Sequence, residues 1–321
     1  VTDIERGGVF AQIIGTLELM KPEEKKLIKG IIINRFRGDL SLFEEGKEWI
    51  EKKTGIPILG ILPWLNDKFP PEDSLDILEK KHKEIGYEIK VGIIKLPSIS
   101  NFSDIDPLEN EGSIFTYWIK TSQDLNKYDF IILPGSKQTI KDLIFLKESG
   151  LTEDIKDYSK NQGNIFGICG GLQMLGTILK DPYFKEGRKL NNKESIQGIG
   201  LLPLKTEFLK NKITKQISCE SIWPCPSKIN GFEMHNGVTE LDKSQKNNFK
   251  PIPIFKEIDL GWYLSKKEGG LIAGTYIHGI FENDKWRNDF INLIRKNKNL
   301  PKLENKMRSY KIKKESIIEN L

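Results

Sequence analysis

The sequence predicts an α/β protein built from two domains, and two observations support this. First, short apolar runs typical of buried strands alternate with segments of helical period. Such strand–helix–strand order indicates a largely parallel sheet with helices packed on it. Second, the chain has 321 residues, which is enough for about two domains of ordinary size.

The first predicted domain covers residues 1–86 and contains the clearest alternation of this kind. The β-rich run at 29–34 ends in a polar loop at 35–39, and Thr54-Gly55 is a typical helix stop. A charged stretch from Pro70 to Glu88 reads as the end of this domain and a linker. The expected elements are a helix over 9–19, a strand over 29–34, a helix over 42–53 and a strand over 56–63.

The second predicted domain covers residues 87–297, and a basic tail at 298–321 follows it. The strand expected over 113–119 alternates in polarity and should pair beside the strand at 89–94. Mostly short strands with turns are expected over 198–277, and a surface helix is expected in the tail. The remaining expected elements are a strand over 130–133 and helices over 139–148, 151–162 and 285–296.

Composition excludes several classes of protein. The chain is 38% hydrophobic and 30% charged, which is typical of a globular protein, and no apolar run reaches the length of a membrane span. The net charge of +5 is spread over many helices, and no nucleic-acid-binding motif is present. The three cysteines are few and unpatterned, which suits a reducing compartment. We therefore predict a cytoplasmic protein with neither a membrane nor a nucleic acid as partner.

The strongest functional signal is a glycine-rich corner around Cys169. An apolar strand over 165–168 breaks at this corner, and a helix is expected over 172–179. The pattern Gly167-x-Cys169-x-Gly171 is the cysteine version of a nucleophile elbow, whose tight turn leaves no room for a Cβ. The helix start behind the sulfur favours the thiolate, and the Gly170 N–H points where an oxyanion would form. The alternative is a small, inert core cysteine.

A cysteine that attacks an amide needs a histidine partner, and the chain has three histidines. His278 ends the apolar run 270–277, which places it at the carboxyl edge of a sheet, where Cys169 also lies. His82 falls in the charged stretch and reads as a surface residue, whereas His235 competes as a residue that lines the site. The turn Pro134-Gly135-Ser136 offers a second backbone donor to an oxyanion, or is a plain strand–helix turn.

These motifs resemble the class I (triad) glutamine amidotransferase domain, a flavodoxin-like α/β domain. The resemblance implies that Cys169 forms a γ-glutamyl thioester and that His278 is the base. It also implies that Gln173 holds L-glutamine and that Gly135 and Gly170 form the oxyanion hole. The carboxylate usual two residues after the histidine is replaced by Ile280, so the third catalytic residue stays open, with Glu282 nearby. This departure is similar to the amidotransferases of cobalamin biosynthesis.

The first domain narrows the resemblance to the cobyric acid synthase family. The segments 3–11, 30–39 and 60–64 carry it, and the Arg-Phe-Arg-Gly-Asp loop at 35–39 favours this family over cobyrinate a,c-diamide synthase. The resemblance implies a remnant of a P-loop-type, dethiobiotin-synthetase-like domain that uses ATP with Mg²⁺ and holds no tightly bound cofactor. Asp3 would lie near Mg²⁺ and Asn34 would read adenine, although both residue types commonly serve as caps or turns. The P-loop itself is expected to precede residue 1.

The implied reaction is the glutamine-dependent, ATP-driven amidation of corrin carboxylates b, d, e and g of adenosylcobyrinic acid a,c-diamide. Other readings stay open. The chain could make the a,c-diamide or serve another ATP-dependent amidotransferase. It could be a MinD/Mrp-like nucleotide-binding scaffold with an inert glutaminase-like domain. It could also be a cysteine hydrolase of the α/β-hydrolase type, with Asp259 as the acid.

Overall fold

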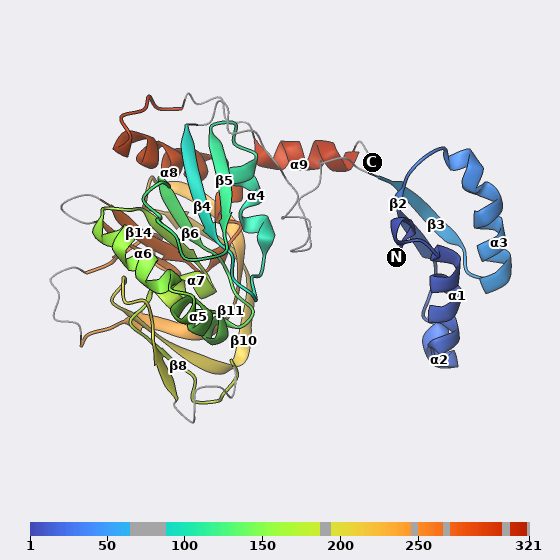
Figure 1. Cartoon of the computed structure of the whole chain (residues 1–321), viewed down its shortest axis with the longest axis horizontal. Coiled ribbons are helices and arrows are strands. Elements are labelled where there is room, and N and C mark those ends of the chain that lie inside the picture. Colours follow the sequence, from blue (N-terminus) through green and yellow to red (C-terminus); the bar gives the residue numbers. More distant parts are fainter. Residues whose placement is uncertain (65–87, 187–193, 245–249, 266–269, 304–308, 320–321) are drawn as a thin grey trace. The chain divides into compact units, whose positions relative to one another are not determined.

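The computed structural model shows two compact units, Val1–Pro70 with Glu315–Leu321 and Pro71–Lys314 (Figure 1). It describes residues 1–64, 88–186, 194–244, 250–265, 270–303 and 309–319. His82 and nearly all of the predicted linker lie outside these described residues. No helix in the described part of the chain is both long and apolar enough to cross a membrane.

Within its described residues, the first unit is a parallel sheet of three strands with helices on it, as its alternation predicts. The strand order is β1 (Thr2–Asp3), β2 (Ile31–Phe36), β3 (Ile58–Pro63). Its helices are α1 (Val9–Leu19), α2 (Pro22–Lys25) and α3 (Glu44–Thr54).

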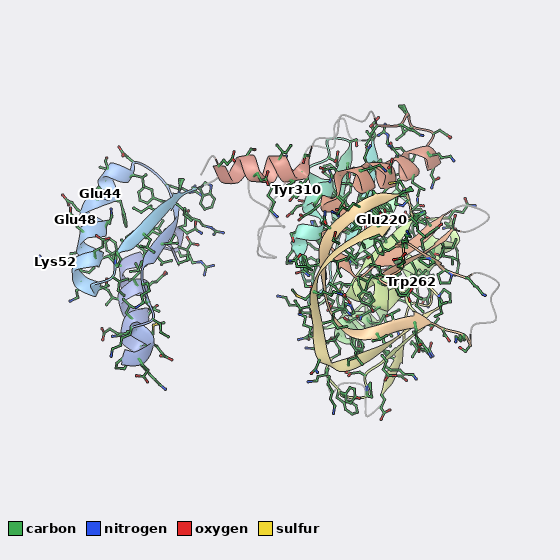
Figure 2. All side chains as sticks on the ribbon, turned by 180° about the vertical axis from the view of Figure 1, so that it is seen from behind. Glu44, Glu48, Lys52, Glu220, Trp262 and Tyr310 are labelled. Atoms are coloured by element: carbon green, nitrogen blue, oxygen red, sulfur yellow. The ribbon has the colours of Figure 1, made fainter. Side chains whose placement is uncertain are left out.

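A small hydrophobic core holds this unit together. Val9 and Ile13 of α1 pack with Ile33 of β2 and Ile50 of α3. The opposite side of α3 carries exposed charges, with Glu44, Glu48 and Lys52 following one another along it (Figure 2). Gly55 ends α3 in the left-handed conformation, as the Thr54-Gly55 stop predicts.

The second unit is built on a mixed sheet of seven strands in the described part of the chain. The predicted pairing is confirmed, since β4 (Ile89–Ile94) and β5 (Ile114–Ile119) are parallel neighbours. From β14 to β5 all neighbours are parallel, and β12 and β13 add an antiparallel edge. The full order is β12 (Ile252–Pro253), β13 (Gly261–Ser265), β14 (Leu271–Thr275), β7 (Ile165–Ile168), β6 (Phe130–Leu133), β4, β5.

Helices cover both faces of this sheet, and successive residues of β7 point to opposite faces. Phe166 makes edge-to-face contacts with Phe290 and Trp286 of α8 (Asp284–Asn297). Its neighbour Gly167 points to the other face, where a Cβ would lie 2.6 Å from the backbone nitrogen of Leu172. That face carries α5 (Thr139–Glu148), α6 (Leu151–Lys160) and α7 (Gly170–Leu175).

A second sheet of five described strands lies in the same unit, and it differs from the sequence-based expectations at two points. The short strands expected over 198–277 include β12, β13 and β14, but the region also holds two long paired strands, β10 (Leu204–Ser221) and β11 (Ser227–Leu241). The helix expected over 172–179 ends at Leu175, because residues 178–180 form β8, which pairs in parallel with β10. Such long-range pairing leaves no mark in local periodicity. Strands β9 (Ser195–Gln197) and β15 (Ile277–His278) complete the order β15-β11-β10-β8-β9.

Short elements connect these layers, and the tail ends in a helix. The predicted surface helix of the basic tail is α9 (Tyr310–Glu319). Between β4 and β5 lie η4 (Phe102–Asp104) and α4 (Asp106–Glu109), and η5 (Ile280–Glu282) precedes α8. In the first unit, η1 (Ile4–Arg6) and η2 (Leu40–Phe43) are single turns.

Candidate active site

Cys169 lies in the sharp corner between β7 and α7 that the sequence predicts. Its φ of 51° and ψ of −106° are strained for a residue with a Cβ, and its N–H donates to the Thr275 carbonyl oxygen at 2.7 Å. A Cβ on Gly171 would lie 1.8 Å from the carbonyl oxygen of Leu133. The second glycine of the motif is therefore a steric requirement of the elbow.

His278 is buried beside Cys169 and is held by a carboxylate. Its Nδ1 lies 2.7 Å from Oδ2 of Asp104, whose Oδ1 accepts the backbone N–H of Gly279, also at 2.7 Å. The ring lies close enough to Cys169 for the sulfur to raise its pKa, and it stacks on Phe232 with centroids 5.1 Å apart. Cys169, His278 and Asp104 thus supply the groups that a nucleophile, a base and an orienting acid would need, with Asp104 bonded to His278.

The electrostatics of this cluster favour a charged imidazole. Burial by itself lowers the pKa of His278, but the hydrogen bonds and negative charges of Asp104 and Cys169 outweigh it and raise the pKa to about 10. His278 is therefore an imidazolium near neutral pH, next to the sulfur. A histidine in this position is the partner that a cysteine nucleophile needs.

Asp104 is the site residue that the sequence reasoning did not find. It lies on η4, in the loop that follows β4 at the carboxyl edge of the parallel sheet, where ligand sites of such sheets occur. Applying that edge rule to the acidic loop after Ile94 would have made Asp104 a candidate. The same loop brings the amide nitrogen of Asn101 to 3.1 Å from His278 Nδ1.

Neither carboxylate considered from the sequence contacts His278. Glu282 forms an ion pair with Lys314 at 3.8 Å. Asp259, the acid required by the α/β-hydrolase alternative, is exposed. That alternative also expects the acid between nucleophile and histidine in the sequence, whereas Asp104 precedes both. The hydrolase reading therefore has no geometric support.

The turn at residues 134–137 packs directly against the elbow and the histidine. A Cβ on Gly135 would lie 3.3 Å from Cε1 of His278, and one on Gly170 would lie 3.0 Å from the backbone nitrogen of Ser136. Asp142 anchors this turn, because its carboxylate accepts the Ser136 hydroxyl at 2.6 Å and the Ser98 N–H at 3.1 Å. Gly170 opens α7, where backbone N–H groups lack intrahelical acceptors. The two glycines predicted for an oxyanion hole thus border one site.

Gln173 is buried one helical turn after Cys169, with both ends of its amide bonded to the protein. Its Oε1 accepts the Thr139 hydroxyl at 3.3 Å, and its Nε2 donates to the Asn236 carbonyl at 2.9 Å. The Cys169 thiol meets the neighbouring Met234 carbonyl at 3.5 Å. One edge of β11 therefore faces the elbow with two backbone carbonyl groups.

Asp3 and Asn34 belong to the first unit and are register partners on β1 and β2. Asp3 accepts the Glu5 N–H at 3.0 Å and pairs with Arg35 at 3.3 Å, while Asn34 accepts the Arg35 N–H at 2.9 Å. Among the described residues, no cluster of three or more His, Cys, Asp or Glu could hold a metal ion. Asp3 thus caps η1 through Glu5, and its ion pair with Arg35 joins β1 to β2.

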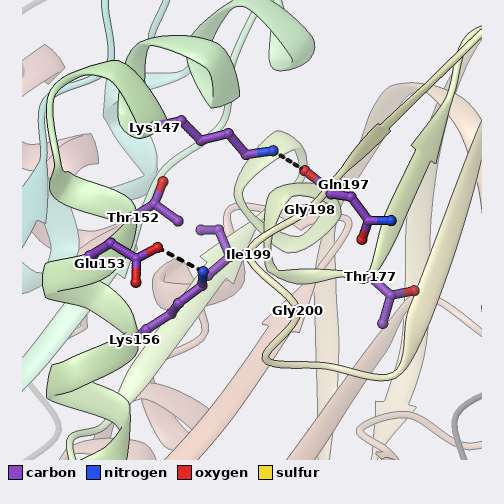
Figure 3. Close-up of a pocket in the computed structure, with 9 residues that line it drawn as sticks. All are labelled: Lys147, Thr152, Glu153, Lys156, Thr177, Gln197, Gly198, Ile199 and Gly200. Atoms are coloured by element: carbon purple, nitrogen blue, oxygen red, sulfur yellow. Dashed lines mark hydrogen bonds and ion pairs between the residues drawn. The ribbon is translucent and has the colours of Figure 1, made fainter. Parts of the chain in front are cut away.

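A polar cavity of about 360 Å³ lies elsewhere in the second unit, and neither Cys169 nor His278 lines it (Figure 3). Its two lysines are both engaged. Lys147 donates to the Gln197 carbonyl oxygen, and Lys156 pairs with Glu153 at 2.8 Å. The remaining lining residues are Thr152, Thr177, Gly198, Ile199 and Gly200. This cavity is separate from the catalytic cluster.

Comparison with known proteins matches the second unit to a family model and the whole chain to named relatives. Residues 90–286 match the family model of the CobB/CobQ-like glutamine amidotransferase domain. The whole chain is 73% identical to a cobyric acid synthase of Prochlorococcus marinus subsp. pastoris and 74% identical to that of another Prochlorococcus marinus strain. It spans 63% of the length of each. The solved structure of PurLQS from Thermotoga maritima is 15% identical, with a TM-score of 0.46 over 64% of this chain and 99% of that one.

Proposed function

Because the chain belongs to the CobB/CobQ-like glutamine amidotransferase family, we propose that it hydrolyses L-glutamine at Cys169 and releases ammonia. The observation that supports this most directly is the hydrogen bond of buried His278 to Asp104, beside Cys169, whose sulfur raises the pKa of the ring. A thiolate, a charged imidazole and a fixed carboxylate are the groups that amide cleavage by a cysteine requires.

The reaction then follows from these groups. The Cys169 thiolate attacks the side-chain amide carbon of glutamine, and the resulting oxyanion is met by backbone N–H groups at Gly170 and at the Gly135 turn. The His278 imidazolium gives its proton to the leaving nitrogen, so ammonia departs and a γ-glutamyl thioester remains. Neutral His278 next removes a proton from water, which attacks the thioester. Glutamate leaves and the thiolate–imidazolium pair is restored.

Labelling with a glutamine analogue that carries an electrophilic diazoketone tests this proposal. We expect one label per chain, on Cys169, with protection by L-glutamine. Cys169→Ala should lose both the label and glutamine hydrolysis, whereas the control Cys225→Ala should keep both. Cys225 is a suitable control because burial raises the pKa of its thiol, which makes it a poor nucleophile. Hydrolysis that survives Cys169→Ala would show that the nucleophile is wrong.

The wider reaction that we propose is that of the relatives named cobyric acid synthase. This chain spans 63% of the length of such a relative. Ammonia from Cys169 would be used to amidate carboxylates b, d, e and g of adenosylcobyrinic acid a,c-diamide. ATP is required because an ionised carboxylate is a poor electrophile and must be activated first. In this proposal, residues 1–86 contribute to the ATP site, with Asp3 near Mg²⁺ and Asn34 at adenine. Residues 87–297 form the glutaminase domain, and residues 298–321 form a tail.

Corrinoid specificity is tested with a protein that has the full length of the relatives. It is supplied with either the a,c-diamide or cobyrinic acid. We expect turnover of the a,c-diamide with glutamine and ATP, and none of cobyrinic acid. The reverse preference would support the a,c-diamide synthase alternative. For a scaffold with an inert glutaminase-like domain, Cys169→Ala would change nothing. Our proposal instead expects that variant to lose glutamine-dependent amidation and to keep amidation with free ammonia.

A further inference from the structure

A buried histidine–carboxylate pair that the mechanism above does not use lies next to the catalytic cluster. Nε2 of His235 is 2.7 Å from a carboxylate oxygen of Glu233, and both side chains are buried. The two residues are two positions apart on β11, so they share a face of the strand. The His235 ring stacks on Tyr276, with ring centroids 3.8 Å apart and planes 24° apart.

Tyr276 connects this pair to the proposed catalytic residues. Its hydroxyl lies 2.5 Å from the Thr239 hydroxyl. It also stands two residues before His278, and Glu233 is the register partner of the intervening Ile277. The pair therefore contacts, through ring and backbone, the segment that delivers the catalytic histidine.

The His235 ring is held in its neutral form. Burial lowers the pKa of His235, and the Glu233 carboxylate opposes that shift only in part. Its Nδ1 is buried and has no hydrogen-bond partner within the described residues, so a proton there would leave an unbonded N–H in the interior. Nε2 therefore carries the hydrogen and donates to Glu233, which fixes the orientation of the ring.

We propose that Glu233 and His235 are positioning residues for glutamine hydrolysis. This inference rests on the function proposed above. Glu233 orients the His235 ring, the ring fixes Tyr276, and Tyr276 in turn fixes the segment that brings His278 to Cys169. The pair acts on the arrangement of reacting groups, so it should affect the chemical step more than glutamine binding.

The test measures inactivation of the 321-residue chain by the diazoketone glutamine analogue, separating the maximal inactivation rate from the half-saturating concentration. Three variants separate the contributions of the Glu233 charge, the His235 ring and the hydrogen bond between them. Glu233→Gln removes the charge, His235→Gln keeps a donor to Glu233 but loses the stacked ring, and His235→Phe keeps a stacked ring but loses the donor. The control is Glu240→Gln, on the same strand, where an exposed glutamate pairs with Lys205 at 3.0 Å.

We expect the maximal inactivation rate of the three variants to fall by roughly 10- to 100-fold, the scale on which small misplacement of reacting groups acts. The half-saturating concentration should stay near the wild-type value, and Glu240→Gln should match wild type in both. Circular dichroism and thermal denaturation identify any variant that is not folded, and Glu233→Gln, which changes the side chain least, decides the question if the others fail. A folded Glu233→Gln variant with the wild-type maximal inactivation rate overturns the inference. A fall in that rate that the unfolded fraction of the variant explains also overturns it. A wild-type chain that is not labelled at all would instead overturn the proposed function.

Discussion

At the scale of single residues, the site depends on one carboxylate, Asp104, which bonds both the His278 ring and the backbone N–H that follows it. Asp104→Asn keeps the size of the side chain but removes its charge, so the imidazolium loses the group that stabilises it. We expect glutamine hydrolysis to fall roughly 100-fold or more, as when the acid of a catalytic triad is replaced. Steady-state kinetics check this. Near wild-type activity would contradict the role of Asp104, and Asp259→Asn, an exposed residue, is the control.

The charge state of His278 gives a second prediction at this scale. Its raised pKa of about 10 means that the imidazolium persists well above neutral pH. Its contribution to folding stability is fully present below about 6.5, the unperturbed value, and is lost as pH rises through about 10. Glutamine hydrolysis should therefore decline on the alkaline side with a midpoint near 10. In Asp104→Asn, where burial still lowers the pKa but the carboxylate no longer raises it, the midpoint should move to lower pH. An unchanged midpoint would contradict this assignment.

At the scale of elements, the strand–corner–helix unit of β7 and α7 is set by close backbone contact. A Cβ at Gly171 would collide with the backbone of β6, at 1.8 Å from the Leu133 carbonyl oxygen, and backbone atoms cannot rotate away. We expect Gly171→Ala to lower the free energy of unfolding by about 3 kcal/mol or more, the range of severe single mutations. Urea denaturation measures this. The matched control is Gly112→Ala, which has open space and no positive φ, and equal effects of the two changes would refute the steric argument.

At the scale of the whole molecule, each unit has its own hydrophobic core. Every residue that we place in glutamine hydrolysis lies in the second unit, within Pro71–Lys314. We therefore expect a chain of residues 88–314 to fold and to be labelled by the glutamine analogue at the rate of the 321-residue chain. Circular dichroism and labelling kinetics check this. A folded but unlabelled fragment would show that the first unit contributes to the glutaminase site.

The sequence alone determined much of this protein because its strongest signals are local. The Gly167-x-Cys169-x-Gly171 corner, the strand-end His278 and the Thr54-Gly55 helix stop are each readable within a few residues, since turn sterics and strand ends are short-range. Only the tertiary structure decided what depends on distant pairing. Asp104 meets His278 across 174 positions of sequence, β8 replaces the end of a predicted helix by pairing with β10, and His235 binds Glu233 rather than Cys169. Local residue patterns do not encode these contacts, because the packing of sheets and loops brings together residues that are far apart in the chain.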